Sequence, residues 1–210
     1  MAICTACGVW TEPPVLVRDS AGMGMACPHC GHTEPFAQYP LCWIGGASGS
    51  GKSTLVPLLR LCLPGYVVFE GEAIDFWRFD GPPGDYGSLY NQWLKVGYEI
   101  ALNGCPVVIA ATALPAQLEA CTMRCRFTTI AYLGLVCRPD TQTARLLHRP
   151  PWRNAAAPKF IAAACTFSRQ LETAARADPT AIMLHDTTDT RPEASAQEIA
   201  AWVRVQLLQP

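Results

Sequence analysis

The sequence predicts an α/β fold, a three-layer sandwich around a parallel sheet of five strands, with a small cysteine-rich module in front of it. Short apolar runs alternate with longer amphipathic stretches from Tyr39 onward. A glycine-rich segment follows the first apolar run, and two pairs of cysteines precede it. Continuously apolar strands that are separated by helices are typical of parallel sheets covered on both faces. These observations together favour one α/β domain with a short N-terminal addition.

The composition is that of a chain with a well-packed core. Half of the 210 residues are hydrophobic and only 16% are charged, which argues against disorder. The net charge is -1, so we do not expect nucleic acid as a partner. The chain lacks a signal-peptide pattern and has no run of about 18 apolar residues, so we expect no membrane span. Its eleven cysteines are largely spread through apolar segments, which predicts a reducing, cytoplasmic location.

The alternation of patterns gives the expected order of elements. Strands are expected at residues 41–45, 66–70, 106–111, 129–136 and 181–185, and helices at residues 52–62, 86–103, 140–148, 158–176 and 194–208. Right-handed crossovers then place helices on both faces of the sheet. We expect two domains, at residues 1–38 and 39–210.

The segment GGASGSGKSTLVPLL, which begins at Gly45, contains a complete phosphate-binding motif between a strand and a helix. Its glycines allow successive N–H groups to point inward, and the helix adds the positive end of its dipole. We expect Lys52 to reach the β- and γ-phosphates of ATP and Ser53 to supply an oxygen to Mg²⁺. A glycine-rich turn with an accidental lysine is the alternative. The residues expected to bind the nucleotide are Gly46, Ser48, Gly49, Ser50, Gly51, Lys52, Ser53 and Thr54.

Two glutamates, Glu70 and Glu72, stand where the second apolar run ends. Side chains at i and i+2 of a strand point the same way, and open α/β sheets bind ligands at this carboxyl edge. We expect Glu72 to remove a proton from a substrate hydroxyl and Glu70 to support the Mg²⁺ site. Ordinary surface acids at a solvated strand end are the alternative.

The loop and the acidic pair together resemble the P-loop kinases of small molecules, which include shikimate, gluconate, adenylylsulfate and nucleoside or nucleotide kinases. The resemblance covers roughly residues 41–205. These kinases carry Asp-x-Asp where this chain has Glu70-Gly71-Glu72. The resemblance implies a three-layer P-loop NTPase sandwich, ATP and Mg²⁺ as cofactors, and a small-molecule hydroxyl as phosphate acceptor.

An aromatic and polar stretch after Glu72 predicts the acceptor side of the site. Trp77 can stack on a planar base or a sugar face, and it can equally serve core or lid packing. Asp75 and Arg78 lie one helical turn apart and can hold a polar acceptor together. Thr112, after the third apolar run, can bind phosphate or substrate or cap the next helix.

A basic, proline-interrupted segment predicts a lid. The sequence RPDTQTARLLHRPPWRNAAAPKF begins at Arg138, and two prolines break any helix between Arg149 and Arg153. A helix, a basic loop and a second helix are the layout of a kinase lid, whose arginines would neutralise charge during transfer. A basic surface corner is the alternative.

The N-terminal cysteines predict a structural metal site. Two C-x-x-C pairs, each followed by a glycine, have the spacing of a four-cysteine zinc ribbon. The expected Zn²⁺ ligands are Cys4, Cys7, Cys27 and Cys30. Two redox dithiols are the alternative. Because Arg18 is the only basic residue before position 39, we expect the ribbon to brace its neighbour, contact a protein or mediate self-association.

These expectations combine into one function. The chain is expected to be an ATP-dependent phosphotransferase that acts on a hydroxyl of a small molecule, with a nucleoside or nucleoside-like acceptor as first choice. A kinase of polynucleotide ends, with the ribbon as reader, is one alternative. A non-catalytic, nucleotide-dependent binding module whose ribbon docks a partner is another.

Overall fold

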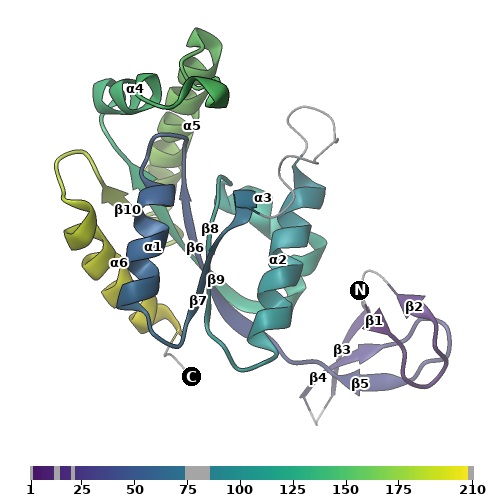
Figure 1. Ribbon diagram of the computed structural model, residues 1–210. Coiled ribbons are helices and arrows are strands. Elements are labelled where there is room, and N and C mark those ends of the chain that lie inside the picture. The colour runs from purple at the N-terminus through teal and green to yellow at the C-terminus, as the bar shows by residue number, and fades with distance from the viewer. Residues whose placement is uncertain (1, 12–14, 20–21, 74–85, 208–210) are drawn as a thin grey trace.

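A parallel sheet of five strands forms the centre of the molecule (Figure 1). The computed structural model describes residues 2–11, 15–19, 22–73 and 86–207. The strands of the central sheet are β6 (Tyr39–Gly46), β7 (Val67–Glu70), β8 (Val107–Ala110), β9 (Phe127–Val136) and β10 (Met183–Asp186). Their spatial order is β10-β9-β6-β8-β7, and all neighbours are parallel. The strand before the phosphate-binding motif therefore lies in the middle of the sheet.

Helices cover both faces of this sheet (Figure 1). They are α1 (Lys52–Cys62), α2 (Gly87–Ala101), α3 (Pro115–Glu119), α4 (Pro139–Leu147), α5 (Pro158–Ala177) and α6 (Pro192–Leu207). Helices α1 and α6 pack on one face, and α2, α3 and α5 contribute to the core on the other. The three-layer α/β sandwich expected from the sequence is confirmed.

The alternation of side chains along β6 explains the two cores. Leu41 and Trp43 belong to the core under α2 and α5, whereas Cys42 and Ile44 belong to the core under α1 and α6. All four are completely buried. A central strand with helices on both sides needs apolar residues at every position, because successive side chains point to opposite faces. That is why the run Leu41-Cys42-Trp43-Ile44 has no polar member.

The observed elements differ from the expected ones mainly at their ends. Helix α1 has the expected bounds and includes Pro57, which is exposed on its solvent side. Strand β9 begins two residues before the expected start, and β10 begins two residues after it. The short helix α3 (Pro115–Glu119) was not among the expected helices. Its five residues offer too little periodicity to recognise, although Gln117 accepts a hydrogen bond from the N–H of Leu114 and so caps it (2.8 Å).

The N-terminal module, which we define as the described residues up to 38, forms two small antiparallel sheets. One pairs β1 (Ala2–Ile3) with β2 (Trp10–Thr11), and the other contains β3 (Val15–Asp19), β4 (Gly22–Ala26) and β5 (Thr33–Pro35). The chain passes directly from this module into the first residue of β6. The module therefore lies at the amino end of the central strand, away from the phosphate-binding motif at its carboxyl end (Figure 1).

A buried arginine connects the N-terminal module to the α/β core. The guanidinium carbon of Arg126 lies 4.6 Å from the ring centroid of Phe36 and 4.9 Å from that of Tyr98. The hydroxyl of Tyr98 donates to the carbonyl of Ala37 (3.0 Å), and the amide of Gln38 donates to the carbonyl of Cys125 (2.7 Å). These contacts combine cation–π attraction with hydrogen bonds across the boundary.

None of the helices in the described part of the chain has the length and apolar character that a membrane span requires.

Candidate active site

The phosphate loop, residues 46–53, is a tight turn that starts the helix α1. Gly46, Gly49 and Gly51 have φ angles of 149°, 87° and 107°, which side chains with a Cβ rarely adopt. At Gly46 a Cβ would lie 2.5 Å from the hydroxyl of Ser50. The turn therefore depends on glycine at these positions, as a cradle of inward N–H groups requires.

Lys52 lies inside this turn and is held by the backbone. Its Nζ donates to the carbonyls of Gly46 (2.7 Å) and Ala47 (3.2 Å). Burial lowers the pKa of Lys52, while the negative charges of Glu72 and Glu70 act in the opposite direction. The ammonium group of Lys52 is therefore buried near two carboxylates and bound by two backbone carbonyls. A charged polyphosphate would be a stronger partner than these carbonyls.

Side chains from outside the loop hold three of its consecutive carbonyl groups. The carbonyl of Ser48 accepts from Gln142 (2.8 Å), that of Gly49 from Arg145 (3.3 Å), and that of Ser50 from Thr187 (2.9 Å). Holding these carbonyls turns the planar peptides so that the N–H groups of Gly49 and Gly51 point away from the supports, whereas the N–H of Ser50 donates to the carbonyl of Ala47 (3.2 Å). The supports come from α4 and from the segment after β10.

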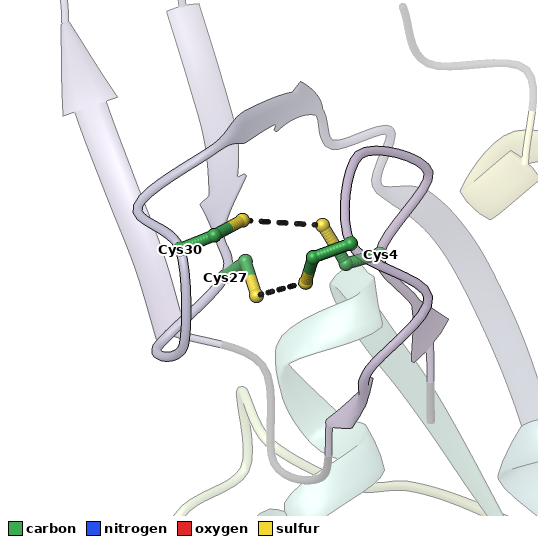
Figure 2. A group of neighbouring side chains, drawn as sticks. Cys4, Cys27 and Cys30 are labelled. Carbon is green, nitrogen blue, oxygen red and sulfur yellow. Dashed lines mark hydrogen bonds between the residues drawn. The ribbon is translucent and has the colours of Figure 1, made fainter.

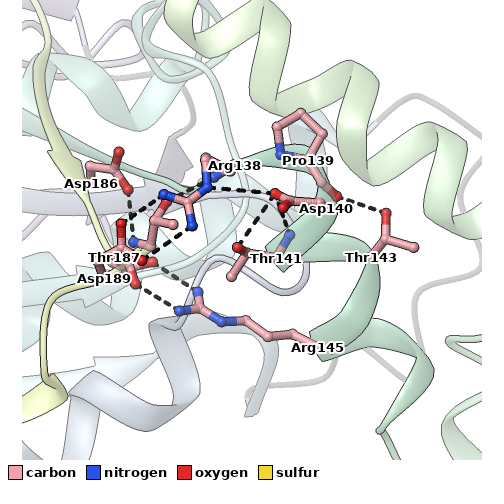
Figure 3. A network of polar contacts seen from close by, with 10 residues as sticks. Arg138, Pro139, Asp140, Thr141, Thr143, Arg145, Asp186, Thr187 and Asp189 are labelled. Carbon is pink, nitrogen blue, oxygen red and sulfur yellow. Dashed lines mark hydrogen bonds and ion pairs between the residues drawn. The ribbon is translucent and has the colours of Figure 1, made fainter.

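Figure 3 shows how these supports are tied to each other. Arg145 donates to the hydroxyl of Thr187 (2.9 Å) and to its carbonyl (2.7 Å). Arg138 forms a two-pronged ion pair with Asp189, at 2.7 and 3.2 Å. Two segments that are far apart in the sequence therefore form one clamp behind the phosphate loop.

The acidic pair occupies two different positions rather than one strand edge. Glu70 ends β7 and accepts a short hydrogen bond from the hydroxyl of Ser53. Glu72 lies in a 3-10 helix (Gly71–Ala73), and its Oε1 accepts from the N–H (3.2 Å) and the hydroxyl (3.1 Å) of Thr112. A Cβ on Gly71 would come within 2.8 Å of both Ala111 and Trp93. The chain thus turns tightly against the end of β8 after Glu70. The expectation that both glutamates point the same way from one strand end did not include this turn.

The basic segment borders the same cavity. Arg149 follows α4, and Arg153 ends a short 3-10 helix (Pro151–Arg153). Burial lowers the pKa of Arg149, nearby Arg153 lowers it further, and Glu70 and Glu72 counteract both effects. Arg153 also lies over the ring of Trp152, 5.1 Å from its centroid. Two cations and two carboxylates therefore line one cavity.

One cavity of about 1030 Å³ joins these groups, which is ample for a nucleotide and a second ligand. The expected site residues that line it are Ser48, Gly49, Gly51, Lys52, Ser53, Thr54, Glu70, Glu72, Thr112, Arg149 and Arg153. Ser50 is fully buried and its hydroxyl has no hydrogen-bond partner among the described residues. Asp75, Trp77 and Arg78 lie outside the described residues. The far wall is apolar and aromatic, and it includes Leu89, Tyr90, Trp93, Phe160 and Phe167.

Sequence reasoning did not identify Gln142, Arg145 and Thr187 as parts of this site. Arg145 was visible only as one member of a basic series, and Gln142 as an ordinary polar residue of a helix. Thr187 is contributed by the chain after β10, more than a hundred residues from the phosphate loop. Their common role is to bind backbone carbonyls, for which the sequence has no signal.

The four N-terminal cysteines form a compact cluster (Figure 2). Their sulfur atoms all lie within 4.8 Å of one another, and the pairs Cys4–Cys30 and Cys7–Cys27 are each 3.7 Å apart. Four sulfurs at about 2.3 Å from one tetrahedral Zn²⁺ would be about 3.8 Å apart, so the donor set fits zinc. Backbone N–H groups of Cys30 and His29 lower the pKa of Cys27 to about 7, whereas burial and the neighbouring cysteine side chains raise the pKa of Cys7 to about 12.

The two halves of this cluster have the same backbone. The N–H of Gly8 donates to the backbone carbonyl of Cys4, and the N–H of Gly31 donates to the backbone carbonyl of Cys27, each at 2.9 Å. Both glycines are left-handed, with φ angles of 71° and 73°. His32 faces Thr5 and Glu34 instead of the sulfurs. The repeated turn supports a four-thiolate site and gives no reason to replace a cysteine ligand by histidine.

Comparisons with known proteins identify the fold. No protein-family model matches the sequence, and no curated protein matches it. A sugar kinase from Janibacter sp. matches the structure with a TM-score of 0.60 and 16% identity, over 81% of this chain and 97% of that one. The tunicamycin resistance protein of Deinococcus radiodurans matches with a TM-score of 0.58 and 19% identity, over 82% and 100%.

A third solved structure belongs to the same group. The shikimate kinase from Acinetobacter baumannii, in complex with shikimate, matches with a TM-score of 0.53 and 16% identity, over 81% of this chain and 96% of that one. The strand order around the phosphate loop and these matches agree. This chain has the P-loop kinase fold, and its N-terminal module carries a four-cysteine cluster.

Proposed function

We propose that this protein is an ATP-dependent phosphotransferase that moves the γ-phosphate of ATP to a hydroxyl of a small molecule. The observation that carries the proposal is the arrangement around one cavity. A phosphate loop with a buried lysine lies on one side, and a glutamate with an unpartnered carboxylate oxygen lies beside it. Such a pairing suits a reaction that needs both a bound polyphosphate and a base.

The nucleotide would lie along the phosphate loop. Free N–H groups of the loop and Lys52 would bind the β- and γ-phosphates, with Lys52 leaving the carbonyl of Gly46 to do so. Ser53 and Glu70, which already touch, offer the oxygen atoms that Mg²⁺ prefers. Bound Mg²⁺ would neutralise charge on the phosphates.

The acceptor hydroxyl would approach from the side of Glu72. Its proton would pass to the carboxylate of Glu72 while its oxygen forms the new bond to phosphorus and the bond to ADP breaks. Arg149 and Arg153, which line the same cavity, would stabilise the charge on the transferred group. Except for Arg145, which holds the phosphate loop, the charged side chains around the cavity thus have roles in one displacement.

We further propose a nucleoside or nucleoside-like acceptor. The rings of Tyr90, Trp93, Phe160 and Phe167 line the cavity, and the ring centroids of Tyr90 and Trp93 lie 5.8 Å apart. Flat apolar faces of this kind bind planar rings. Gln117 adds an amide at the same wall, which can pair with the edge of such a ring.

For the N-terminal module we propose a structural zinc ribbon as a separate domain, residues 1–38, on a kinase domain of residues 39–210. Four thiolates close the coordination of Zn²⁺, so the ion would have no open position for catalysis. All eleven cysteines lie in the described part of the chain, where none of them forms a disulfide. The module would brace the core or contact a protein.

A phosphate-transfer screen tests the proposed function. Purified protein, MgATP and panels of nucleosides, sugars and amino-hydroxy compounds are combined, and ADP formation is measured for each acceptor. We expect one class, nucleosides first, to accelerate ADP formation, and Lys52→Ala to abolish the acceleration. ADP formation that no acceptor accelerates, with ATP still bound, would instead favour a nucleotide-dependent binding module.

A further inference from the structure

Glu72 is held on one side only. Its Oε1 accepts both the N–H and the hydroxyl of Thr112, at 3.2 and 3.1 Å. Its Oε2 is buried and has no hydrogen-bond partner among the described residues. A buried carboxylate oxygen without a partner is unfavourable, so its position must be maintained by the bonds on the other oxygen. The described residues therefore hold this carboxylate through Oε1.

Thr112 is in turn attached to the phosphate loop. Its hydroxyl shares one proton between two acceptors, Oε1 of Glu72 (3.1 Å) and the carbonyl of Gly46 (3.0 Å), which also accepts from Lys52. Thr112 comes two residues after the end of β8, the strand that separates β6 from β7. One hydroxyl thus lies between the segment that carries the lysine and the segment that carries the acid.

We propose that Thr112 is a positioning residue that orients the carboxylate of Glu72 by holding its Oε1. This inference rests on the proposed phosphotransfer. It assigns no direct contact between Thr112 and the acceptor, because both donors of Thr112 are already engaged with Glu72. The hydroxyl fixes the direction of the acid relative to the loop on which the phosphate would lie.

The chain permits a clean substitution. Thr112→Val keeps the shape of the side chain and the backbone N–H, so Glu72 retains one of its two donors. Thr112→Ser keeps the hydroxyl. Thr122→Val is a matched control, because it removes a threonine hydroxyl that donates to a side chain, Asn91, away from the cavity (3.0 Å).

The first measurement is a double-mutant cycle in thermal stability, which needs no turnover. Thr112→Val is compared with the parent and, in a second pair, Glu72→Ala with Thr112→Val plus Glu72→Ala. We expect Thr112→Val to lower the melting temperature more in the parent than in the Glu72→Ala background, where only the contact with the carbonyl of Gly46 is left to lose. Equal losses in both backgrounds would show that the two side chains do not interact, and would overturn the proposal.

The second measurement is the same cycle in phosphate transfer. We expect Thr112→Val to lower kcat about tenfold with the KM for ATP nearly unchanged, Thr112→Ser to restore most of it, and Thr122→Val to have no effect. In the Glu72→Ala background the valine should cause no further loss. A stability coupling together with an unchanged kcat would overturn the positioning role.

The two readouts separate this inference from the proposed function. If the parent transfers phosphate to no acceptor while the stability coupling is present, the phosphotransferase proposal fails and the catalytic meaning of Thr112 fails with it, although the contact is real. If the parent transfers phosphate and the coupling is missing, the function stands and the assignment of Thr112 is wrong.

Discussion

The two ends of the cavity are constructed in different ways. The nucleotide end is a single continuous segment, residues 46–53, whose backbone is held by side chains from behind. The acceptor end combines side chains from separate segments, among them Glu72, Thr112 and Trp93. A continuous backbone loop binds phosphate, which every nucleotide carries. A wall of separate side chains can instead be altered by substituting one residue at a time. The first end would therefore define the reaction and the second the acceptor.

The largest effect is expected at the nucleotide end. Lys52→Ala removes the buried cation of the phosphate loop, and with it a partner of the β- and γ-phosphates. We expect both ATP binding and transfer to become undetectable, which calorimetry and an ADP assay would measure. Normal ATP affinity in this variant would show that the nucleotide does not lie on the loop.

The acceptor end should separate binding from transfer. Glu72→Gln keeps the size of the side chain and its contact with Thr112 but removes the base. We expect ATP affinity to be unchanged and transfer to fall by about 10²–10⁴-fold, the usual contribution of a placed base. Unchanged transfer would mean that another group accepts the proton, and Asp75 would be tested next.

The lid arginines should affect the rate more than the binding of ATP. Arg149→Ala should lower kcat about 10²-fold and Arg153→Ala less, because Arg149 is half-buried near the glutamates while Arg153 lies over Trp152. Arg176→Ala, at an exposed pair with Glu172, is the matched control. If all three variants turn over at the parental rate, the basic segment is only a surface feature.

A smaller effect is expected where Glu70 meets Ser53. Glu70→Gln keeps the fold but weakens the oxygen set beside the phosphates. We expect the Mg²⁺ concentration for half-maximal transfer to rise about tenfold, as for other residues that support metal ligands. A titration with Mg²⁺ at saturating ATP measures this. An unchanged Mg²⁺ requirement would remove Glu70 from the metal site.

The smallest effect on the cavity is expected from the N-terminal module. Purified protein should contain about one zinc per chain, and Cys27→Ser should release it, because Cys27 is one of four sulfurs in the cluster. Since the described residues of the module do not line the cavity, ATP binding should change little. Elemental analysis without zinc in protein prepared free of chelator would contradict the assignment.

The sequence predicted the features that short segments form by themselves. It missed the contacts between residues that lie far apart in the sequence. The phosphate loop, α1 and the cysteine pairs are short segments whose chemistry is complete in the sequence. The position of Glu72 depends on a turn that packs against Trp93 and Ala111, which only the folded chain brings together. Likewise Gln142 and Thr187 bind loop carbonyls across more than ninety residues of sequence. Pairings of that kind leave no periodic or motif signal.

The central claim is that the cavity transfers phosphate to a hydroxyl, and the fate of the γ-phosphate tests it most directly. ATP labelled at the γ-phosphate is incubated with the protein and the best acceptor from the screen, and the label in the acceptor ester is compared with that in inorganic phosphate. We expect nearly all released label in the ester, in a one-to-one ratio with ADP, and none with Lys52→Ala. Label that appears only as inorganic phosphate, or no release with any acceptor, would contradict the claim.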